Sequence, residues 1–283
     1  MLVNMKEMLE KARKSDYAVP AINTQGGNFD IIRACTQAAE EMNSPIILAH
    51  YIATGLYAGH DFFYEVAKFC AEKVSVPVAI HLDHGDGYDI CKECFDLGFT
   101  SLMYDGSALP IEENAAMTNK VMEFAKTRNV TVEAEVGELL RLDEINAGKT
   151  STNTVKISDV KKFLDLCQPD ALAIGIGNAH GYYTETPEIR LDILEEVTKF
   201  SDIPLVLHGC TGMDHEVIKK SLTMGVSKIN FGTQIRFQYL DHLKAAAAEE
   251  KNGRAFLVMQ NASNALKEDI KKIIELSNSK GRA

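Results

Sequence analysis

The sequence contains no run of apolar residues that approaches the roughly 20 needed for a membrane-spanning helix. Its first residues, MLVNMKEMLEKARKSDYAVPAIN, alternate apolar and charged positions at helical spacing. They therefore lack the continuous apolar core of a secretory signal. From these two absences we expect a cytoplasmic protein that makes no contact with membranes.

Proline and cysteine are also sparse. The chain has 7 Pro and 19 Gly among 283 residues, and 46% of its residues are hydrophobic, a composition that argues against disorder and collagen-like repeats. The 6 Cys are not clustered, so we expect reduced thiols rather than a disulfide framework. Cys91 and Cys94 form a lone CxxC within a stretch of helical periodicity, and half of a zinc or redox motif favours two ordinary helix positions.

Basic residues are fewer than acidic ones. The chain has 30 Lys and Arg and 40 Asp and Glu, which gives a formal net charge of -10. No local basic patch offsets this excess of negative charge. The charge balance therefore argues against a nucleic acid or an anionic membrane as a partner.

Eight short runs of apolar or β-branched residues recur between amphipathic stretches. The runs are VPAINT (19–24), PIILAH (45–50), VPVAIHLDH (76–84), SLMYDG (101–106), VTVEAEVG (130–137), ALAIGIG (171–177), PLVLHG (204–209) and KINFGT (228–233). Helical spacing lies between them, for example at 28–42, 65–74, 158–167, 188–200 and 215–225. Runs that are apolar on both faces are typical of parallel strands covered by helices.

Eight strand and helix units over about 230 residues are the number that closes a (β/α)8 TIM barrel. We therefore predict an α/β chain with a single barrel domain over residues 1–283. A doubly wound open sheet is the alternative, but INTQGGNF after the first strand lacks the GxGxxG fingerprint. Two further helices, split near Gly253, follow the eighth strand, and the extra C-terminal helix is either an oligomer contact or a barrel cap.

Two connections are longer than the minimal repeat requires. Residues 137–157 form a long polar segment after the fifth strand, which we expect to be a lid or an insertion. Residues 178–188 form a shorter one after the sixth strand.

Polar side chains collect where the predicted strands end, which is where barrel enzymes build their active sites. They are Asn23, His50, Asp83, His84, Asp105, Glu133, Glu135, His180, His208 and Asn230. Three histidines among them, His84, His180 and His208, come from three different strands. Such a set suits a three-ligand zinc site with an open fourth position. His60, His215 and His242 lie in helical patterns and are read as structural.

Carboxylates flank this predicted metal site. Asp83 is adjacent to His84 and could exchange a proton with a substrate bound to the same ion. Asp105 and Glu135 could hold a second cation or orient the histidines as outer partners. The two-residue period of a strand places His81 on the same side as Asp83, opposite to His84.

Glycine turns follow the seventh and eighth strands. They read Gly209-Cys210-Thr211-Gly212 and Asn230-Phe231-Gly232-Thr233. Small residues there let backbone N–H groups approach an anion, at the usual phosphate position of a barrel.

Six motifs in order carry a resemblance to a known family. They are HLDHG at 81–85, YDGS at 104–107, VEAEVG at 132–137, GNAHGYY at 177–183, LVLHGCTG at 205–212 and KINFGT at 228–233. Over nearly the whole chain, these motifs resemble those of the class II ketose-bisphosphate aldolases, the metal-dependent fructose- and tagatose-bisphosphate aldolases of carbohydrate metabolism and glycolysis.

The resemblance implies roles for individual residues. It makes His84, His180 and His208 ligands of one catalytic Zn²⁺, Asp105 and Glu135 a second divalent-metal position, and Asp83 the acid/base. It assigns the dihydroxyacetone phosphate moiety to a set of substrate-binding positions: Asn23, Gly181, Gly209, Cys210, Thr211, Asn230, Phe231, Gly232 and Thr233. It also implies a monovalent cation, Na⁺ or K⁺, near Gly181. Arg254 would reach the site of a neighbouring subunit in a homodimer or homotetramer.

The implied chemistry is reversible aldol cleavage of a ketose 1,6-bisphosphate to dihydroxyacetone phosphate and an aldehyde such as glyceraldehyde 3-phosphate. A metal would stabilise the enediolate, and Asp83 would remove the C4 hydroxyl proton. A loop carboxylate, Asp143 or its neighbour Glu144, would protonate the enediolate carbon.

Three positions depart from the family pattern. Leu140 and Arg141 stand where the loop is glycine-rich, Ala49-His50-Tyr51 replaces Gln-x-Ser at the end of the second strand, and Ala248 replaces a lysine that grips the far phosphate. These departures all concern the aldehyde half of the substrate, so a ketose 1-phosphate or another aldehyde is an alternative.

Other functions remain open at this point. A Schiff-base aldolase would need a strand lysine such as Lys228, which the sequence places at the start of the eighth strand, the wrong end for the site. A sugar-phosphate isomerase or epimerase could use the same metal ligands. A non-catalytic relative that binds sugar phosphate is a third possibility.

Overall fold

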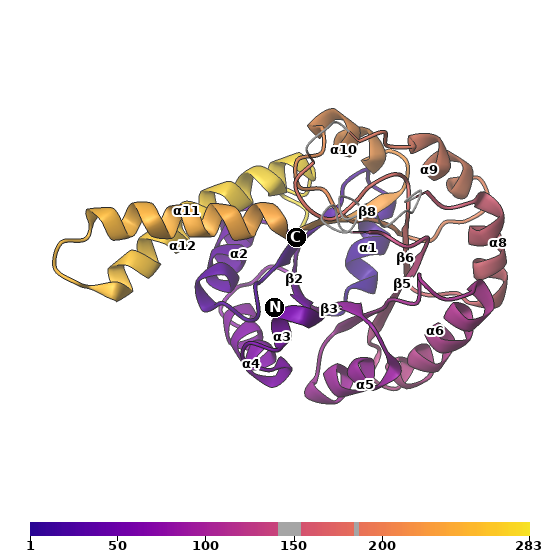
Figure 1. Cartoon of the computed structure of the whole chain (residues 1–283), viewed down its shortest axis with the longest axis horizontal. Coiled ribbons are helices and arrows are strands. Elements are labelled where there is room, and N and C mark those ends of the chain that lie inside the picture. Colours follow the sequence, from indigo (N-terminus) through magenta and orange to yellow (C-terminus); the bar gives the residue numbers. More distant parts are fainter. Residues whose placement is uncertain (141–153, 184–186) are drawn as a thin grey trace.

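The computed structural model of the chain describes residues 1–140, 154–183 and 187–283. Eight parallel strands close into a barrel in the order β1 to β8. The strands are β1 (Val19–Asn23), β2 (Ile46–Tyr51), β3 (Val78–Gly85), β4 (Ser101–Tyr104), β5 (Thr131–Val136), β6 (Ala171–Ile174), β7 (Leu205–Leu207) and β8 (Val226–Phe231). The predicted (β/α)8 barrel is confirmed, and the helices surround it as a ring (Figure 1).

The helices that alternate with these strands pack their apolar stripes against the outside of the barrel. They are α2 (Phe29–Met42), α4 (His60–Ala71), α5 (Tyr88–Leu97), α6 (Ile111–Ala125), α8 (Ile157–Leu166), α9 (Leu191–Thr198) and α10 (His215–Leu222). The short helix α3 (Ile52–Gly55) and the 3₁₀ turn η1 (Lys126–Arg128) belong to the connections. Helix α2 shows how local sequence sets the boundaries. The Asn28 side chain accepts from Asp30 N and Ile31 N at its start, and Asn43 ends it in the left-handed conformation. No helix in the described part of the chain is long and apolar enough to cross a membrane.

The amino-terminal end of the barrel is filled by α1 (Lys6–Arg13). Met5, Met8 and Leu9 pack into a separate apolar cluster whose barrel members are mostly small or β-branched, such as Ala79, Ala173 and Val206. Small interior residues leave room for this plug. With that end filled, a ligand is expected to enter at the opposite end, where the strands finish.

Strand β8 begins two residues earlier than the KINFGT motif predicts. Val226 pairs with Leu205, and the register then shifts so that Lys228 pairs with Val206. Lys228 therefore lies within the strand rather than at its start, and Asn230 is the next to last residue of the strand.

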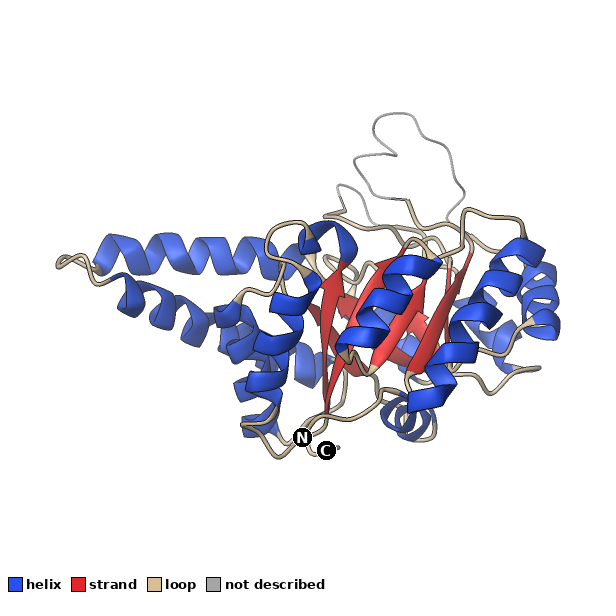
Figure 2. Ribbon diagram, turned by 90° about the horizontal axis from the view of Figure 1, so that it is seen from below, coloured by secondary structure: helices blue, strands red, loops and turns tan. Residues whose placement is uncertain are grey.

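Two long helices follow β8, as predicted: α11 (Thr233–Glu249) and α12 (Ala255–Leu276). They form a hairpin that projects from the barrel in both views (Figures 1 and 2). The base of the hairpin is bound to α2, because Tyr239 donates to Asp30 Oδ2 at 3.0 Å and Ser263 donates to Asp30 O at 2.7 Å. Beyond this base the hairpin exposes apolar side chains, among them Phe256 with 66% exposure.

Candidate active site at the carboxyl ends of the strands

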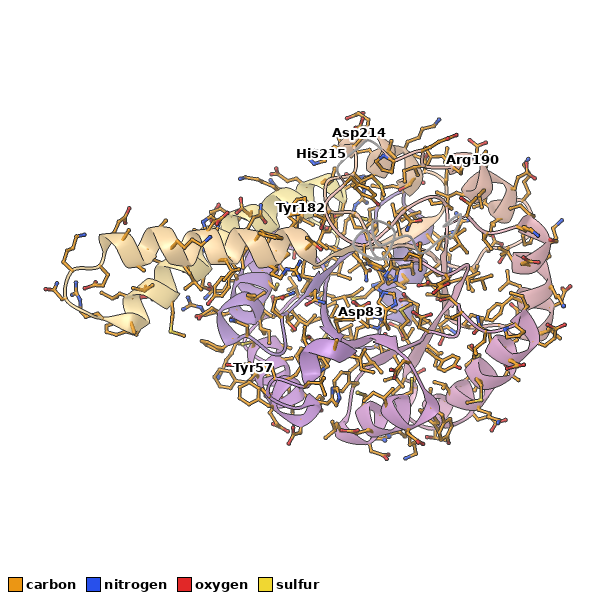
Figure 3. All side chains as sticks on the ribbon, in the orientation of Figure 1. Tyr57, Asp83, Tyr182, Arg190, Asp214 and His215 are labelled. Carbon is orange, nitrogen blue, oxygen red and sulfur yellow. The ribbon has the colours of Figure 1, made fainter. Side chains whose placement is uncertain are left out.

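A cavity of about 410 Å³ opens at the end of the barrel where the strands finish. It is lined by Ala21, Asn23, Gln25, Ala49, Tyr51, Ile52, Thr54, Asp83, His84, Asp86, Asp105, Leu139, His180, Gly181, Gly209, Thr211, Asn230, Phe231, Gly232, Thr233 and Arg236. Most of the predicted site residues are therefore brought to one cavity. Figure 3 shows Asp83 near the middle of the barrel, whereas Tyr57, Arg190 and His215 lie at the periphery.

The three predicted histidine ligands converge. One nitrogen from each of His84, His180 and His208 lies within 4.8 Å of the others. His84 Nε2 and His208 Nδ1 lie 3.1 Å apart. Two nitrogens bound to one tetrahedral zinc ion at about 2.0–2.1 Å would lie about 3.3 Å apart. The donor set, three imidazoles beside an open cavity, therefore fits a catalytic zinc ion.

His84 reaches the cavity through an unusual backbone. Strand alternation predicts that Asp83 and His84 point to opposite faces. His84 instead has a left-handed backbone with φ of 54°, and the pairing of β3 with β4 shifts register between Leu82 and Gly85. Both side chains consequently line the same cavity.

Asp105 acts as the hydrogen-bond partner of His84. Its Oδ2 lies 2.7 Å from His84 Nδ1, and its Oδ1 accepts from Ser107 Oγ at 2.6 Å. Burial lowers the pKa of His84, but the hydrogen bond to Asp105 and the nearby carboxylates outweigh it and raise this pKa to about 10. Asp105 thus holds the ring with Nε2 toward the other histidines, as an outer-shell carboxylate does.

Glu135 is buried beside His84, whose Nδ1 lies 4.0 Å from Glu135 Oε2. Neither carboxylate oxygen has a hydrogen-bond partner in the described part of the chain. Burial raises the pKa of Glu135 well above its ordinary value, and the negative charge of Asp105 adds to the effect. His84, Asp105 and Glu135 form a second group with ligand atoms within 4.8 Å. A buried carboxylate of this kind suits a cation, which fits the predicted second metal position.

Asp83 lies beside the three histidines. It is 6% exposed, and its Oδ1 accepts a hydrogen bond of 3.1 Å from Asn230 Nδ2. Burial by itself would raise the pKa of Asp83, but the positive electrostatics of His84 and His208 outweigh it, so the pKa is lowered. An ionised carboxylate facing the cavity can accept a proton from a bound hydroxyl group.

The two glycine turns, which follow β7 and β8, also line the cavity. Gly209 has φ of 67°, and a Cβ atom there would lie 2.2 Å from Ala179 O, so a larger residue cannot replace it. Gln234 N donates to Thr211 Oγ1 at 3.1 Å, which joins the turn after β7 to the start of α11. Of the predicted substrate-binding positions, Asn23, Gly181, Gly209, Thr211, Asn230, Phe231, Gly232 and Thr233 line the cavity.

Two predicted substrate-binding positions are not brought to this cavity. Cys210 is 1% exposed and its thiol donates to Leu207 O at 3.3 Å, since the turn directs its side chain into the core. Arg254 lies at the tip of the α11–α12 hairpin, where it forms an ion pair of 3.1 Å with Glu250. Asp143 and Glu144 lie outside the described residues.

The two departures from the family pattern at the end of β2, His50 and Tyr51, lie in different places. Tyr51 lines the cavity, and its ring lies edge-on to His84 with centroids 6.1 Å apart. His50 is turned away from the cavity, stacked on Phe63, with Nε2 at 2.8 Å from His60 Nδ1. Burial lowers the pKa of His50 to about 3. His50 therefore belongs to the wall between β2 and α4.

Several cavity residues escaped the sequence analysis, and Arg236 is the most informative. It is the one Lys or Arg among the described residues that line the cavity. Its position one turn into α11, directly after the glycine turn of 230–233, is a signal that could have identified it. Asp86 and Gln25 were missed because neither belongs to a strand end or a quoted motif.

Lys228 is sealed inside the barrel below the cavity. Its side chain is fully buried, and Nζ donates to Glu133 Oε1 and Oε2 at 2.9 and 2.7 Å. It is absent from the described lining of the cavity. A Schiff-base nucleophile must reach the substrate, so the geometry disfavours the Schiff-base alternative.

Comparison with known proteins agrees with this geometry. The sequence model of the family described as fructose-bisphosphate aldolase class-II matches residues 3–282. The fructose-bisphosphate aldolase of Mycoplasma pneumoniae is 36% identical over 256 residues, which cover 89% of this chain and 87% of that protein. The crystal structure of the YdjI aldolase from Escherichia coli K12 matches with a TM-score of 0.84 and 27% identity, covering 100% of both chains.

A more distant structure shares the fold alone. Fructose-bisphosphate aldolase from Campylobacter jejuni matches with a TM-score of 0.82 at 20% identity, covering 100% of this chain and 97% of that one. With the family match over almost its full length and a relative at 36% identity, this chain is an aldolase, a carbon–carbon lyase, and belongs to the class II fructose-bisphosphate aldolase family.

Proposed function

We propose that the chain catalyses the zinc-dependent, reversible aldol cleavage of a ketose 1,6-bisphosphate of the fructose or tagatose type. The products would be dihydroxyacetone phosphate and an aldehyde such as glyceraldehyde 3-phosphate. The observation that carries this proposal is the convergence of His84, His180 and His208 within 4.8 Å, beside the carboxylate of Asp83.

The three histidines would hold the catalytic ion. A divalent ion there would supply a Lewis acid for the negative charge that develops next to the ketone during cleavage. Asp83 would accept the proton of the C4 hydroxyl group as the carbon–carbon bond breaks, and would return it in the reverse direction. The nearby Asn230 amide fixes the Asp83 carboxylate through its hydrogen bond of 3.1 Å. Asp143 or Glu144 would protonate the enediolate carbon to give dihydroxyacetone phosphate, and would remove that proton in the reverse direction.

The glycine turns would hold the phosphate of the dihydroxyacetone phosphate moiety. Gly232 and Thr233 line the cavity at the start of α11, where backbone N–H groups and the helix dipole favour an anion, and Thr211 lines it from the turn after β7. The loop around Gly181 lines the same cavity and is our proposed place for a monovalent cation. Arg236, which the sequence did not predict as a site residue, adds a positive charge to the cavity wall.

A direct test separates this proposal from the other enzyme mechanisms. Purified chain is assayed for release of dihydroxyacetone phosphate from fructose 1,6-bisphosphate and tagatose 1,6-bisphosphate, before and after a chelator and with zinc added back. We expect activity that is lost with the chelator and restored by zinc, and no trapping of substrate by borohydride. Borohydride trapping would indicate a Schiff base, and isomerised sugar phosphate without cleavage would indicate an isomerase or epimerase. A chain that binds these ligands without turnover would indicate a non-catalytic relative.

Tyr51 favours a second candidate substrate, a ketose 1-phosphate or an unphosphorylated aldehyde partner. The phenol ring fills cavity space where the family pattern has a small hydroxyl residue. Ala248 also lacks the positive charge of the family lysine, and a lost charge-assisted hydrogen bond costs about 1.5–3 kcal/mol. Ala248 lies near the end of α11 and does not line this cavity, whereas Arg236 does and adds a positive charge there, so the two substrates must be compared directly.

We predict that the wild-type chain prefers a bisphosphate over its 1-phosphate by less than about a thousandfold in kcat/KM, or roughly 4 kcal/mol. Tyr51→Ser should increase this preference, because it returns the space and the hydroxyl group to the cavity. Tyr57→Ser is the matched control, since Tyr57 is 86% exposed and lies outside the cavity (Figure 3). A larger preference in the wild type, unchanged by Tyr51→Ser, would contradict this view of Tyr51.

We also propose a homodimer or homotetramer in which Arg254 serves a neighbouring site. The α11–α12 hairpin supports this proposal because it exposes Phe237, Leu240, Phe256 and Met259 at 46–66%. Arg254 lies in the connection between α11 and α12, at the end of the hairpin that is far from the barrel (Figure 1), where it pairs with Glu250.

Mixing two inactive chains tests this arrangement. Arg254→Ala and Asp83→Ala chains should each lose activity, but a mixed dimer would contain one cavity with both residues intact. Random exchange into dimers should restore roughly a quarter of wild-type activity. Arg190→Ala, which removes an exposed arginine paired with Asp192, is the control that should stay active alone. Verified subunit exchange without recovery would rule out a shared site.

A further inference from the structure

A buried polar network lies inside the barrel, directly below the three histidines. It contains His81, Ser101, Glu133 and Lys228, which come from four different strands and are all 0% exposed. The aldol chemistry proposed above uses none of these four residues. Burying an amine and a carboxylate costs free energy unless every group is paired, so the network calls for an explanation beyond stability.

Every donor of the Lys228 amine has an acceptor. Nζ lies 2.9 Å from Glu133 Oε1, 2.7 Å from Glu133 Oε2 and 3.2 Å from His81 Nε2. Because the ammonium group has only donors, His81 Nε2 must accept, and the proton of that ring lies on Nδ1. His81 Nδ1 then donates to Ser101 Oγ at 2.6 Å, and Ser101 Oγ donates to Met5 Sδ at 3.4 Å. Each hydrogen bond of the network therefore has a defined donor and a defined acceptor.

Glu133 connects this network to the candidate metal site. Its Oε1 lies 3.1 Å from His208 Nε2. A carboxylate paired with the Lys228 ammonium group only accepts, so His208 donates through Nε2, and its Nδ1 carries the lone pair of the ring. That Nδ1 faces the cavity side, 3.1 Å from His84 Nε2 and 3.4 Å from the Asn230 amide.

We propose that Glu133, held by Lys228, is a positioning residue that fixes the tautomer and ring orientation of His208, so that Nδ1 is available as a metal ligand. This inference rests on the metal site of the proposed function. It assigns Lys228 the role of balancing the buried charge of Glu133 rather than a role in covalent catalysis, and it explains why a charged pair is buried in the middle of the barrel.

Two double variants with equal charge and similar size isolate the contribution of the hydrogen bond. Glu133→Met/Lys228→Met removes the acceptor for His208 together with the ion pair. Glu133→Gln/Lys228→Met also removes the ion pair but keeps an oxygen at the place of Oε1. The amide nitrogen would then face His81 Nε2, which lies 3.7 Å from Glu133 Oε2 in the wild type. Ser101→Ala is a control within the same network that does not contact Glu133.

The measurement is the dissociation constant for Zn²⁺ of the metal-stripped chains, obtained by competition with a chelator. Thermal unfolding of the metal-free chains verifies that each variant is folded. Loss of an outer-shell partner typically weakens metal binding by about 10–100-fold. We expect a loss of that size for the Met/Met variant, and a change of less than about threefold, well below that range, for the Gln/Met and Ser101→Ala variants.

Two outcomes would overturn the inference. Folded Met/Met chain that binds zinc as tightly as the wild type would show that the network only supports the fold. Equal weakening in the Met/Met and Gln/Met variants would show that the ion pair, and not the acceptor for His208, matters. Failure of the wild type to bind zinc would instead refute the proposed function, so the two failures are distinguishable.

A measurement on the wild type covers the case in which the Met/Met variant does not fold. Long-range ¹H–¹⁵N spectra of the metal-free protein report the tautomer of each histidine, and a His208→Gln variant assigns the signal of His208. We expect a proton on Nε2 of His208. A proton on Nδ1 would contradict the inference.

Discussion

A chain with His208→Ala should retain its fold but lose both its zinc and its chelator-sensitive activity. His208 supplies Nδ1 to the group of three histidines, and its ring lies 4.7 Å from that of His84 between centroids. Removing an outer partner of a metal ligand already costs about 10–100-fold in affinity, so removing the ligand should cost more than about 100-fold. Metal analysis of the purified chain, beside the cleavage assay, measures both effects.

His215→Ala is the matched control for this experiment. His215 begins helix α10 at the periphery of the barrel (Figure 3), so its loss should leave zinc content and activity close to those of the wild type. Replacing His84 or His180 should act as His208→Ala does. Full zinc content in His208→Ala chains would refute the three-histidine site.

Asp83→Ala should lower kcat by about 10²–10⁴-fold, the usual contribution of a general acid–base group, while zinc remains bound. The expectation follows from the position of Asp83, which lines the cavity and accepts a hydrogen bond from Asn230 rather than from one of the three histidines. Zinc content and kcat are measured on the same preparation. A loss of zinc in proportion to activity would instead make Asp83 a partner of the metal ligands.

The barrel could be predicted because its information is local and repeated. Each strand is a short apolar run, and the burial of all six residues of β5 and β8 agrees with strands covered on both faces. The end of each strand then fixes which polar residues meet, since a closed parallel barrel places all those ends on one side. This is why the sequence predicted that Asp83, His180 and Asn230 would lie at one end of the barrel, where all three line the cavity.

Other features of the site depend on geometry that sequence periodicity does not encode. The left-handed backbone of His84 breaks the alternation that the β3 sequence suggests. Strand β8 begins at Val226, so Lys228 lies inside the strand rather than at its start, and its side chain is fully buried. The contact of Glu133 with Lys228 spans 95 residues of sequence, and only the closed barrel brings the two side chains together.

The family resemblance assigned the second proton transfer to Asp143 or Glu144, and both lie outside the described residues. Their role stays a prediction, whereas Arg236, which no motif indicated, has a definite place in the cavity wall.

The central claim, a catalytic zinc ion held by three histidines beside Asp83, is tested most directly by a crystal structure of the zinc-loaded chain soaked with a ketose bisphosphate. Anomalous scattering at the zinc edge should show one peak at about 2.0–2.1 Å from a nitrogen of each of His84, His180 and His208. Bound dihydroxyacetone phosphate should lie between that peak and the turns at 209–212 and 230–233. A zinc peak elsewhere, or product bound away from these histidines, would contradict the account.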